Sequence, residues 1–449
     1  MDEIEKKVLE KITPTNKYKK NIDKIVLEIT KKLETEIKKR KLPAAIELVG
    51  SISKDTYLKD DLDIDFFIKF PTKYSKEEMG KNALSIGKAI LNNTEQSYAE
   101  HPYIRGYYKK IKVEVVPCYE IEKASQKLSA VDRTPLHTKY IKGNLSDSQK
   151  PQVLLFKQFL KGIGCYGAEA EIEGFSGYLS EILILKYGSF KKLIENAQKW
   201  KIGEKLSLTK GDFQSFETPL TFIDPVDKSR NVSSAVSKEK FDLFIKACKE
   251  YVKKPSIKFF FPKKVKPWPL ETIKKEIKKQ KSQYVGLKFK KPSIIAENLY
   301  PQVRKAIKSI KDMCIRYDFT IFDTKFYIDS EVYIIIKTKI EPLSDTMRHA
   351  GPPNRLKENI DDFIKKWSND PRLIKEPYEK NGRYFVEIKR EYTDIKDLLK
   401  NKIKTLSLGK NIDQIFKDKY MVLNINDLIN KDLRIFWTEY LENKMPWER

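Results

Sequence analysis

Two aspartates separated by one residue are the first side chains in this sequence that could do chemistry. Asp63 and Asp65 stand directly before the apolar run 66–68. Side chains two apart on a strand point to the same side of a sheet. Two carboxylates held side by side repel each other unless a cation lies between them, and a divalent metal with oxygen ligands is the usual cation. The pair therefore indicates a metal-binding cleft at the start of a buried strand.

A turn that suits a phosphate precedes this pair. Gly50 follows the apolar run 46–49, and glycine allows the tight turn that ends a strand. Ser51 offers a hydroxyl and a backbone amide to a phosphate at such a turn. Asp-x-Asp pairs are usually only solvated turns, but a phosphate-binding turn beside a metal-binding strand indicates a nucleotide site.

A third carboxylate comes from a later strand, expected at 111–117. Its alternation puts Glu114 on the side opposite the two flanking valines. Glu114 is a candidate ligand or base if this strand lies beside the first. Asp61 shares the parity of Asp63 and Asp65, so spacing alone also permits Asp61 as a ligand.

Apolar periodicity and capping residues predict the elements that position these groups. Helices are expected at 16–40, 76–92, 151–161, 175–187, 236–252, 300–316, 355–367 and 394–403, and strands at 44–50, 63–70, 111–117, 285–289, 319–322, 327–340 and 384–390. The run 129–137 is expected to be linker-like. The stretch 254–283, rich in Lys and Pro, is expected to be a domain boundary.

The charge of the chain indicates a polyanionic partner. The 449 residues suffice for about three domains. They include 89 Lys and Arg against 63 Asp and Glu, a net charge of +26. Such a field attracts nucleic acid through its phosphates. An acidic membrane is the rival partner, but the sequence has neither an apolar span nor an amphipathic anchor, so no membrane partner is expected.

Cysteine and histidine usage argues against a zinc enzyme. The four cysteines are far apart in the sequence, and only three histidines exist. Isolated thiols are typical of a reducing compartment. The charged N-terminus lacks the apolar core of a signal peptide, so the protein is expected to be cytoplasmic.

Several motifs together resemble archaeal class I CCA-adding enzymes, which are tRNA nucleotidyltransferases of the superfamily that includes DNA polymerase beta. Besides Gly-Ser at 50–51, Asp-x-Asp at 63–65 and Glu114, the motifs are Tyr-Ala-Glu-His-Pro-Tyr at 98–103, Val-Glu-Val-Val-Pro-Cys-Tyr at 113–119, Ser-Ala-Val-Asp-Arg-Thr-Pro at 129–135, Gly-Phe-Ser-Gly-Tyr-Leu at 174–179 and Asp-Pro-Val-Asp at 224–227. The resemblance covers nearly the whole chain and is most specific up to about residue 260.

The resemblance implies a multidomain α+β protein. A nucleotidyltransferase head with a mixed sheet would span 1–137, and a mostly helical, nucleotide-binding neck would span 138–256. The α/β body and tail domains would span 257–449, with the tail at about 325–395 and the tRNA acceptor arm lying along both.

The resemblance also implies the site. Asp63, Asp65 and Glu114 would be the catalytic and metal-binding acids, with Mg²⁺ as the cofactor. The nucleotide-binding residues for CTP and ATP would be Ser51, Lys54, His137, Lys157, Tyr166 and Arg230. Among these, Arg230 would read the base.

Three residues depart from the family pattern. Lys54 stands where Arg is usual, so a bidentate fork is lost while the charge is kept. Asp63 stands where relatives have Glu. Glu114 replaces the usual Asp, so its carboxylate is moved by the length of one methylene.

The implied activity is template-independent addition and repair of the 3′-terminal CCA of tRNA, using CTP and ATP and releasing pyrophosphate. The alternatives are a poly(A) polymerase-like RNA nucleotidyltransferase and a catalytically silent RNA-binding protein. A homodimer is also compatible with the sequence, with an exposed strand at 327–340 as its contact. The sequence leaves open whether the late aromatics, including Trp437 and Trp447, stack on RNA or pack in a core.

Overall fold

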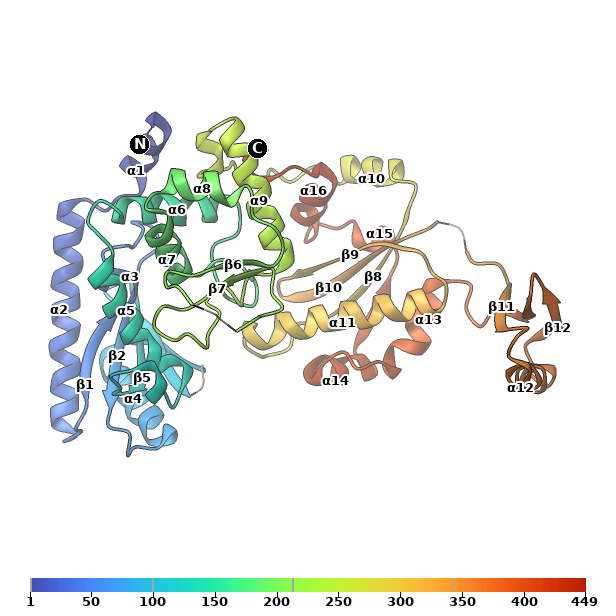
Figure 1. The fold of residues 1–449 in the computed structure, drawn as a ribbon, viewed down its shortest axis with the longest axis horizontal. Coiled ribbons are helices and arrows are strands. Elements are labelled where there is room, and N and C mark those ends of the chain that lie inside the picture. Colours follow the sequence, from blue (N-terminus) through green and yellow to red (C-terminus); the bar gives the residue numbers. More distant parts are fainter. Residues whose placement is uncertain (1, 99–100, 212–213, 341) are drawn as a thin grey trace. The chain divides into compact units, whose positions relative to one another are not determined.

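The fold divides into two compact units in the computed structural model, which describes residues 2–98, 101–211, 214–340 and 342–449, with backbone only at Tyr98 and Asp418 (Figure 1). The first unit runs to Lys264 and also includes Met445–Arg449, and the second is Val265–Lys444. The division falls inside the predicted boundary stretch 254–283. The last five residues belong to the first unit, whereas the sequence grouped them with the body and tail. Ala99 and Glu100 of the motif at 98–103 lie outside the described residues.

A mixed five-stranded sheet forms the N-terminal part of the first unit, in the order β1-β2-β5-β4-β3. The strands are β1 (Ala45–Val49), β2 (Asp63–Phe70), β3 (Asn92–Tyr98), β4 (Pro102–Tyr108) and β5 (Ile111–Tyr119). β2 and β5 are parallel, and the other pairs are antiparallel. Helices α2 (Asn16–Lys39) and α4 (Lys76–Ile90) share one apolar core with this sheet.

Local sequence signals account for both of these helices. In α2, apolar side chains that recur every three or four residues are buried, namely Ile22, Ile25, Ile29, Leu33 and Ile37. In α4, Ser75 and Glu78 form the predicted capping box. The expected fold class, a multidomain protein with mixed helices and sheets, is confirmed.

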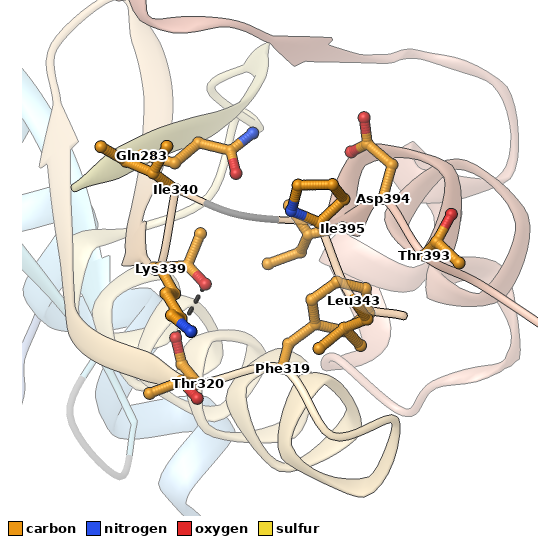
Figure 2. Close-up of a pocket in the computed structure, with 11 residues that line it drawn as sticks. Gln283, Phe319, Thr320, Lys339, Ile340, Leu343, Thr393, Asp394 and Ile395 are labelled. Carbon is orange, nitrogen blue, oxygen red and sulfur yellow. Dashed lines mark hydrogen bonds between the residues drawn. The ribbon is translucent and has the colours of Figure 1, made fainter. Parts of the chain in front are cut away.

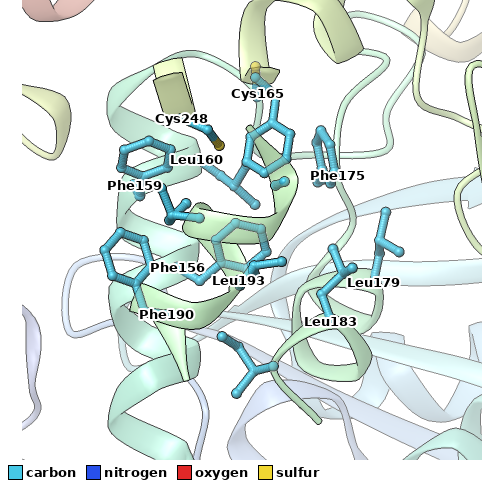
Figure 3. Close-up of a cluster of buried hydrophobic side chains, with 14 of the residues drawn as sticks. Phe156, Phe159, Leu160, Cys165, Phe175, Leu179, Leu183, Phe190, Leu193 and Cys248 are labelled. Atoms are coloured by element: carbon cyan, nitrogen blue, oxygen red, sulfur yellow. The ribbon is translucent and has the colours of Figure 1, made fainter. Parts of the chain in front are cut away.

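A helical layer completes the first unit. It contains α1 (Glu3–Ile12), α5 (Arg133–Asn144), α6 (Lys150–Gly162), α7 (Gly177–Tyr187), α8 (Phe190–Ala197) and α9 (Lys238–Lys253), with the short parallel strands β6 (Glu204–Leu206) and β7 (Leu220–Phe222). Figure 3 shows its core, where Phe156 and Phe159 of α6 lie among Phe175, Phe190 and Leu193. This packing fixes α6 and α7 relative to each other, which matters because both carry site residues.

The linker-like reading of 129–137 is wrong. A short 3₁₀ turn, Ala130–Asp132, leads directly into α5, so His137 lies on a helix. The buried Asp132 carboxylate accepts hydrogen bonds from the backbone N–H groups of Tyr119, Leu128 and Ser129. These bonds order the entry to the helix, and the weak apolar periodicity of α5 gave no sign of it in the sequence.

The second unit contains a four-stranded antiparallel sheet between two helical layers. Its order is β14-β8-β10-β9, with β8 (Gln283–Lys290), β9 (Ile321–Ile328), β10 (Glu331–Thr338) and β14 (Tyr420–Leu423). One face packs against α11 (Ala296–Arg316), α13 (Ile395–Lys402) and α14 (Lys410–Asp418). The other face packs against α10 (Leu270–Lys279), α15 (Ile425–Leu428) and α16 (Arg434–Glu442).

The single strand expected at 327–340 is instead part of a hairpin. β9 ends at Ile328 and β10 begins at Glu331, and β10 lies inside the sheet between β8 and β9. The continuous apolar residues of β10 led to the prediction of one long strand. They instead reflect the burial of β10 on both faces of the sheet. A homodimer stays a prediction, but β10 has no open edge for it.

A small three-stranded sheet packs separately within the second unit. β11 (Thr346–Pro353), β12 (Leu373–Lys380) and β13 (Arg383–Lys389) are arranged as β11-β13-β12 and are covered by α12 (Lys357–Ser368). Phe363, Trp367, Val386 and Ile388 form their own core. The tail expected at about 325–395 therefore begins too early, because residues 325–338 belong to the four-stranded sheet.

The two late tryptophans pack in cores. Trp437 is fully buried in the second unit. Trp447 stacks on Phe259 of the first unit, with ring centroids 5.1 Å apart, and its indole N–H donates to Glu250 Oε2 at 2.6 Å. No helix in the described part of the chain combines the length and apolar character needed to cross a membrane.

Candidate active site

The three predicted acids lie on two adjacent strands. β2 and β5 are parallel, with Asp65 paired to Glu114 and Asp63 paired to Lys112. Asp61 lies before β2 begins, is exposed, and forms an ion pair with Lys161 at 2.8 Å. Asp61 therefore does not share the strand that carries Asp63 and Asp65, and the choice of ligands among these carboxylates stays a prediction.

Two basic side chains lie beside these acids. Lys112 Nζ is 2.9 Å from Asp63 Oδ2 and 3.8 Å from Glu114 Oε1. Arg105, which is paired with Glu114 across β4 and β5, donates from Nε to Glu114 Oε1 at 2.7 Å. Asp63 and Glu114 thus each have a cationic partner from the protein itself.

Among the described residues, no cationic group lies within ion-pair distance of Asp65, which lies against Gly50. Burial, together with the charges of Glu114 and Asp63, raises the pKa of Asp65 to about 7. Gly50 has φ +73°, and a Cβ at Gly50 would come within 2.0 Å of Asp65 Oδ2. The turn after β1 is therefore pressed against the central carboxylate, and only glycine suits this position.

The donor chemistry of the acid set suits a divalent cation. Three carboxylates on neighbouring strands supply hard oxygen ligands, and a dication would relieve the repulsion that raises the pKa of Asp65. Among the described residues, no three His, Cys, Asp or Glu side chains are grouped closely enough to hold a metal ion as they stand. Asp63 and Glu114 are paired instead with Lys112 and Arg105.

A cavity of about 330 Å³ brings together every predicted nucleotide-binding residue. Its lining includes Ser51, Lys54, His137, Lys157, Tyr166 and Arg230, together with Gly50, Ala130, Arg133, Thr134, Thr138, Ser176, Gly177, Tyr178 and Glu181. These residues come from the turn after β1, from α5 and the 3₁₀ turn before it, from α6 and the segment that follows it, from α7 and its N-cap, and from the loop 224–231. Because Gly50 also lies against Asp65, this carboxylate borders the cavity.

A buried glutamate organises one part of the cavity. Glu181 is fully buried, and its carboxylate accepts from Lys54 Nζ at 2.5 Å, from Lys157 Nζ at 3.2 Å and from the Thr56 hydroxyl at 2.6 Å. Burial alone would raise the pKa of Glu181, but the two ammonium groups lower it to about 2. Burial lowers the pKa of Lys54, and the Glu181 carboxylate opposes this effect. Two basic side chains thus meet one carboxylate here, an arrangement that suits a phosphate.

A buried aspartate organises another part. Asp224 Oδ2 accepts from His137 Nε2 at 2.8 Å and from Arg230 Nη1 at 3.0 Å. Its Oδ1 accepts from the Tyr178 hydroxyl at 3.1 Å, and the Tyr178 ring stacks on His137 with centroids 4.0 Å apart. Burial opposes ionisation of Asp224, yet these donors lower its pKa to about 2.

Glu181, Asp224, Tyr178 and Arg133 were missed as functional residues. A signal existed for Glu181, because a charged residue stood inside the apolar run 179–184 of an expected helix. Asp224, Tyr178 and Arg133 each lie within a motif already singled out. Arg133 Nη1 is 3.0 Å from Asp227, and its buried Nε has no hydrogen-bond partner among the described residues.

A second cavity, of about 180 Å³, lies in the second unit and holds none of the predicted site residues (Figure 2). Phe319, Lys339, Ile340 and Leu343 line it together with Asp394. The Asp394 carboxylate accepts from Lys396 N at 2.7 Å and so caps α13. The Asp394 carboxylate in this cavity thus has a local structural role as a helix cap.

Three segments of the chain match known families. Residues 30–137 match the nucleotidyltransferase domain, residues 151–261 match the second domain of tRNA nucleotidyltransferase, and residues 281–424 match the C-terminal domain of the CCA-adding enzyme. The order of these matches follows the sheet with the acids, the helical layer and the second unit.

Curated relatives match the chain along nearly its full length. The CCA-adding enzyme of Methanosarcina barkeri is 33% identical over 98% of this chain and 98% of its own length. The CCA-adding enzyme of Archaeoglobus fulgidus is 33% identical, and that of Picrophilus torridus 35% identical, each over 94% of this chain and 95% of its own length. With one cavity uniting the nucleotide-binding candidates beside three strand-borne acids, this chain belongs to the family of CCA-adding enzymes.

Proposed function

We propose that this protein is a tRNA nucleotidyltransferase that adds and repairs the 3′-terminal CCA of tRNA from CTP and ATP. The observation that carries the proposal is the cavity, because residues from separate parts of the first unit meet there beside Asp65, which is paired with Glu114 on the adjacent strand. Membership of the family supports the same activity. The 3′-hydroxyl of tRNA would attack the α-phosphorus of the nucleotide and release pyrophosphate.

Ser51, Lys54, Lys157 and Tyr166 are proposed to hold the triphosphate. Lys54 and Lys157 share one buried carboxylate, so two basic side chains are held together at the cavity by Glu181. Preorganised positive charge of this kind stabilises phosphate oxygens as charge develops on them. Lys54 supplies a point charge where an arginine would give a bidentate contact.

His137 and Arg230 are proposed to bind the ribose-triphosphate region and the base, respectively. Within the described residues, the guanidinium of Arg230 makes its hydrogen bonds from Nη1 to Asp224 alone. The remaining N–H donors suit the acceptor edge of a base. Both C and A present such acceptors, which agrees with a single residue serving both nucleotides.

Asp63, Asp65 and Glu114 are proposed to hold Mg²⁺. When bound, Mg²⁺ would supply activation of the attacking hydroxyl and neutralise phosphate charge. Asp65 is the best placed of the three, because Asp63 and Glu114 are paired with Lys112 and Arg105. Glu114 reaches Arg105 with its longer side chain, and Arg105 would keep this carboxylate near Asp65.

The rest of the chain is proposed to bind tRNA. The first unit would supply the catalytic head and the neck, and the second unit the body and tail that bind the acceptor arm. The excess of Lys and Arg over Asp and Glu supports a polyanionic partner. We place this activity in the cytoplasm.

An addition assay tests the proposal. Transcripts of tRNA lacking CCA, or ending in C or CC, are incubated with Mg²⁺ and each labelled nucleotide. Two C residues followed by one A, and then arrest, would support CCA addition. A long A tail would instead indicate a poly(A) polymerase-like enzyme, and no incorporation would indicate an RNA-binding protein without this activity.

A further inference from the structure

Asp224 lies behind the cavity wall and joins residues from three elements of that wall. It is fully buried, while His137, Tyr178 and Arg230 line the cavity. His137 comes from α5, Tyr178 from the first turn of α7, and Arg230 from the loop after β7. A buried carboxylate with this many donors is costly to leave unpaired, so its partners are held in place.

The loop that carries Arg230 is closed on itself. The backbone N–H of Asp224 donates to the Arg230 carbonyl at 3.0 Å, and the N–H of Arg230 donates to the Asp227 carbonyl at 2.9 Å. A bridge between Ile223 and Asn231 closes the base of the loop. Arg230 is therefore tied to Asp224 through both backbone and side chain, whereas His137 is tied to this loop through its side chain.

The two bonds meet at one atom. Asp224 Oδ2 accepts from both His137 Nε2 and Arg230 Nη1. Because the carboxylate is ionised and only accepts, Nε2 of His137 carries the hydrogen. A movement of Arg230 toward a bound base would change the bond that orients His137, since both donors share the same oxygen.

We propose that Asp224 is a positioning residue that couples recognition of the nucleotide base by Arg230 to binding of the ribose-triphosphate region by His137. The coupling passes through Oδ2. It rests on the proposed function, because that function gives Arg230 and His137 their roles. Asp224 itself is not part of the cavity lining.

A double-mutant cycle tests the coupling. His137→Ala, Arg230→Ala and the double variant are compared with the unchanged protein by kcat/KM for CTP and for ATP on tRNA lacking the required nucleotide. We expect the loss in the double variant to be smaller than the product of the single losses by roughly threefold or more. Losses that simply multiply would overturn the proposal.

The cycle is then repeated in an Asp224→Asn background. The amide keeps one oxygen, which can still accept from Tyr178, but it puts an NH₂ group in place of the shared oxygen. This NH₂ group cannot accept the hydrogen bonds that His137 and Arg230 donate. We expect the coupling to disappear there, and KM for both nucleotides to rise more than kcat falls. Coupling that persists unchanged in this background would contradict the role of Asp224.

Asp227→Asn is the matched control. Asp227 lies on the same loop, but its side chain pairs with Lys127, Arg133 and Ser229 rather than with the side chains of His137 or Arg230. The coupling should persist in this background, and its loss would mean that any disturbance of the loop abolishes it. If Asp224→Asn fails to fold, as judged by its thermal melt, the cycle with Asp224 intact still shows whether His137 and Arg230 are coupled, and losses that simply multiply there overturn the proposal.

A binding measurement separates this proposal from the proposed function. Equilibrium dialysis with labelled CTP or ATP, without tRNA, yields the same cycle from dissociation constants. If the unchanged protein adds no nucleotide to tRNA, the proposed function fails, while coupling in dialysis would still support Asp224. If addition occurs and neither measurement shows coupling, only the role of Asp224 fails.

Discussion

A methyl group on Gly50 would come within 2.0 Å of the Asp65 carboxylate, and Gly50 also has φ +73°. Gly50→Ala should therefore cost about 1–2 kcal/mol for the left-handed backbone and about 1–3 kcal/mol more for crowding. It should also displace Asp65 and reduce nucleotide addition. Urea unfolding and the addition assay measure the two effects.

Gly143→Ala is the control for this change. Gly143 lies in α5 with open space around the position of a Cβ. Alanine there should stabilise the protein by about 0.5–1 kcal/mol, because it favours the helix. Equal changes in unfolding free energy and in nucleotide addition for the two variants would contradict the close approach of Gly50 to Asp65.

Asp65 should make the metal-free protein less stable as the pH rises. Its pKa is raised to about 7 when folded, against 3.8 for the ordinary carboxyl. Between these values the unfolded chain binds fewer protons than the folded chain, so stability falls as the pH increases. In EDTA, the Tm gain caused by Asp65→Asn should therefore be larger at about pH 7.5 than at about pH 4.5. Each kcal/mol of added unfolding free energy should raise the Tm by about 2–4 °C.

Adding Mg²⁺ at about pH 7.5 provides the control for this measurement. The cation should stabilise the unchanged protein and narrow its difference from Asp65→Asn. An equal gain in Tm at both pH values would contradict the raised pKa of Asp65. Mg²⁺ that stabilises both proteins equally would argue against Asp65 as a ligand.

Asp65→Asn should also abolish nucleotide addition while tRNA binding persists. The substitution is nearly isosteric but removes the charge that a metal site needs. Addition is measured with labelled CTP, and binding by gel shift at fixed salt. Turnover at the rate of the unchanged protein would remove Asp65 from the catalytic set, and lost tRNA binding would point to a general folding defect.

Glu181→Gln should raise KM for CTP and ATP without comparable loss of tRNA affinity. The buried carboxylate holds the ammonium groups of Lys54 and Lys157, and a charge-assisted hydrogen bond is worth about 1.5–3 kcal/mol. The expected rise in KM is therefore roughly 10- to 150-fold, measured from initial rates. Glu195→Gln, on α8 and away from the cavity lining, should leave KM unchanged. A KM rise shared by both variants would remove Glu181 from the phosphate site.

Trp447→Ala should destabilise the first unit by about 3–5 kcal/mol. The ring is almost completely buried against Phe259, so its loss leaves a cavity. Trp447→Phe keeps the stacking but loses the bond to the Glu250 carboxylate, and should cost about 1.5–3 kcal/mol. Urea unfolding checks both values, and near-equal effects would mean that the ring contributes little.

The sequence determined the features that depend on near neighbours along the chain. Alternation put Asp63 and Asp65 on one side of β2, and recurring apolar residues defined α2. The family pattern named six nucleotide-binding residues, and one cavity brings all six together. The inferences about β2, α2 and the cap of α4 succeeded because strand parity, helical periodicity and capping are local properties, whereas the nucleotide-binding roles stay predictions.

Only the tertiary structure decided which charges meet. Lys54 and Glu181 are 127 residues apart in the sequence, and His137 and Asp224 are 87 residues apart. Neither the Arg105–Glu114 pair nor the place of β10 inside its sheet follows from spacing, because strand order and register are set by packing over long distances. The acids could be read from local parity, whereas the buried carboxylates that hold their basic neighbours in place became visible only when distant segments packed together.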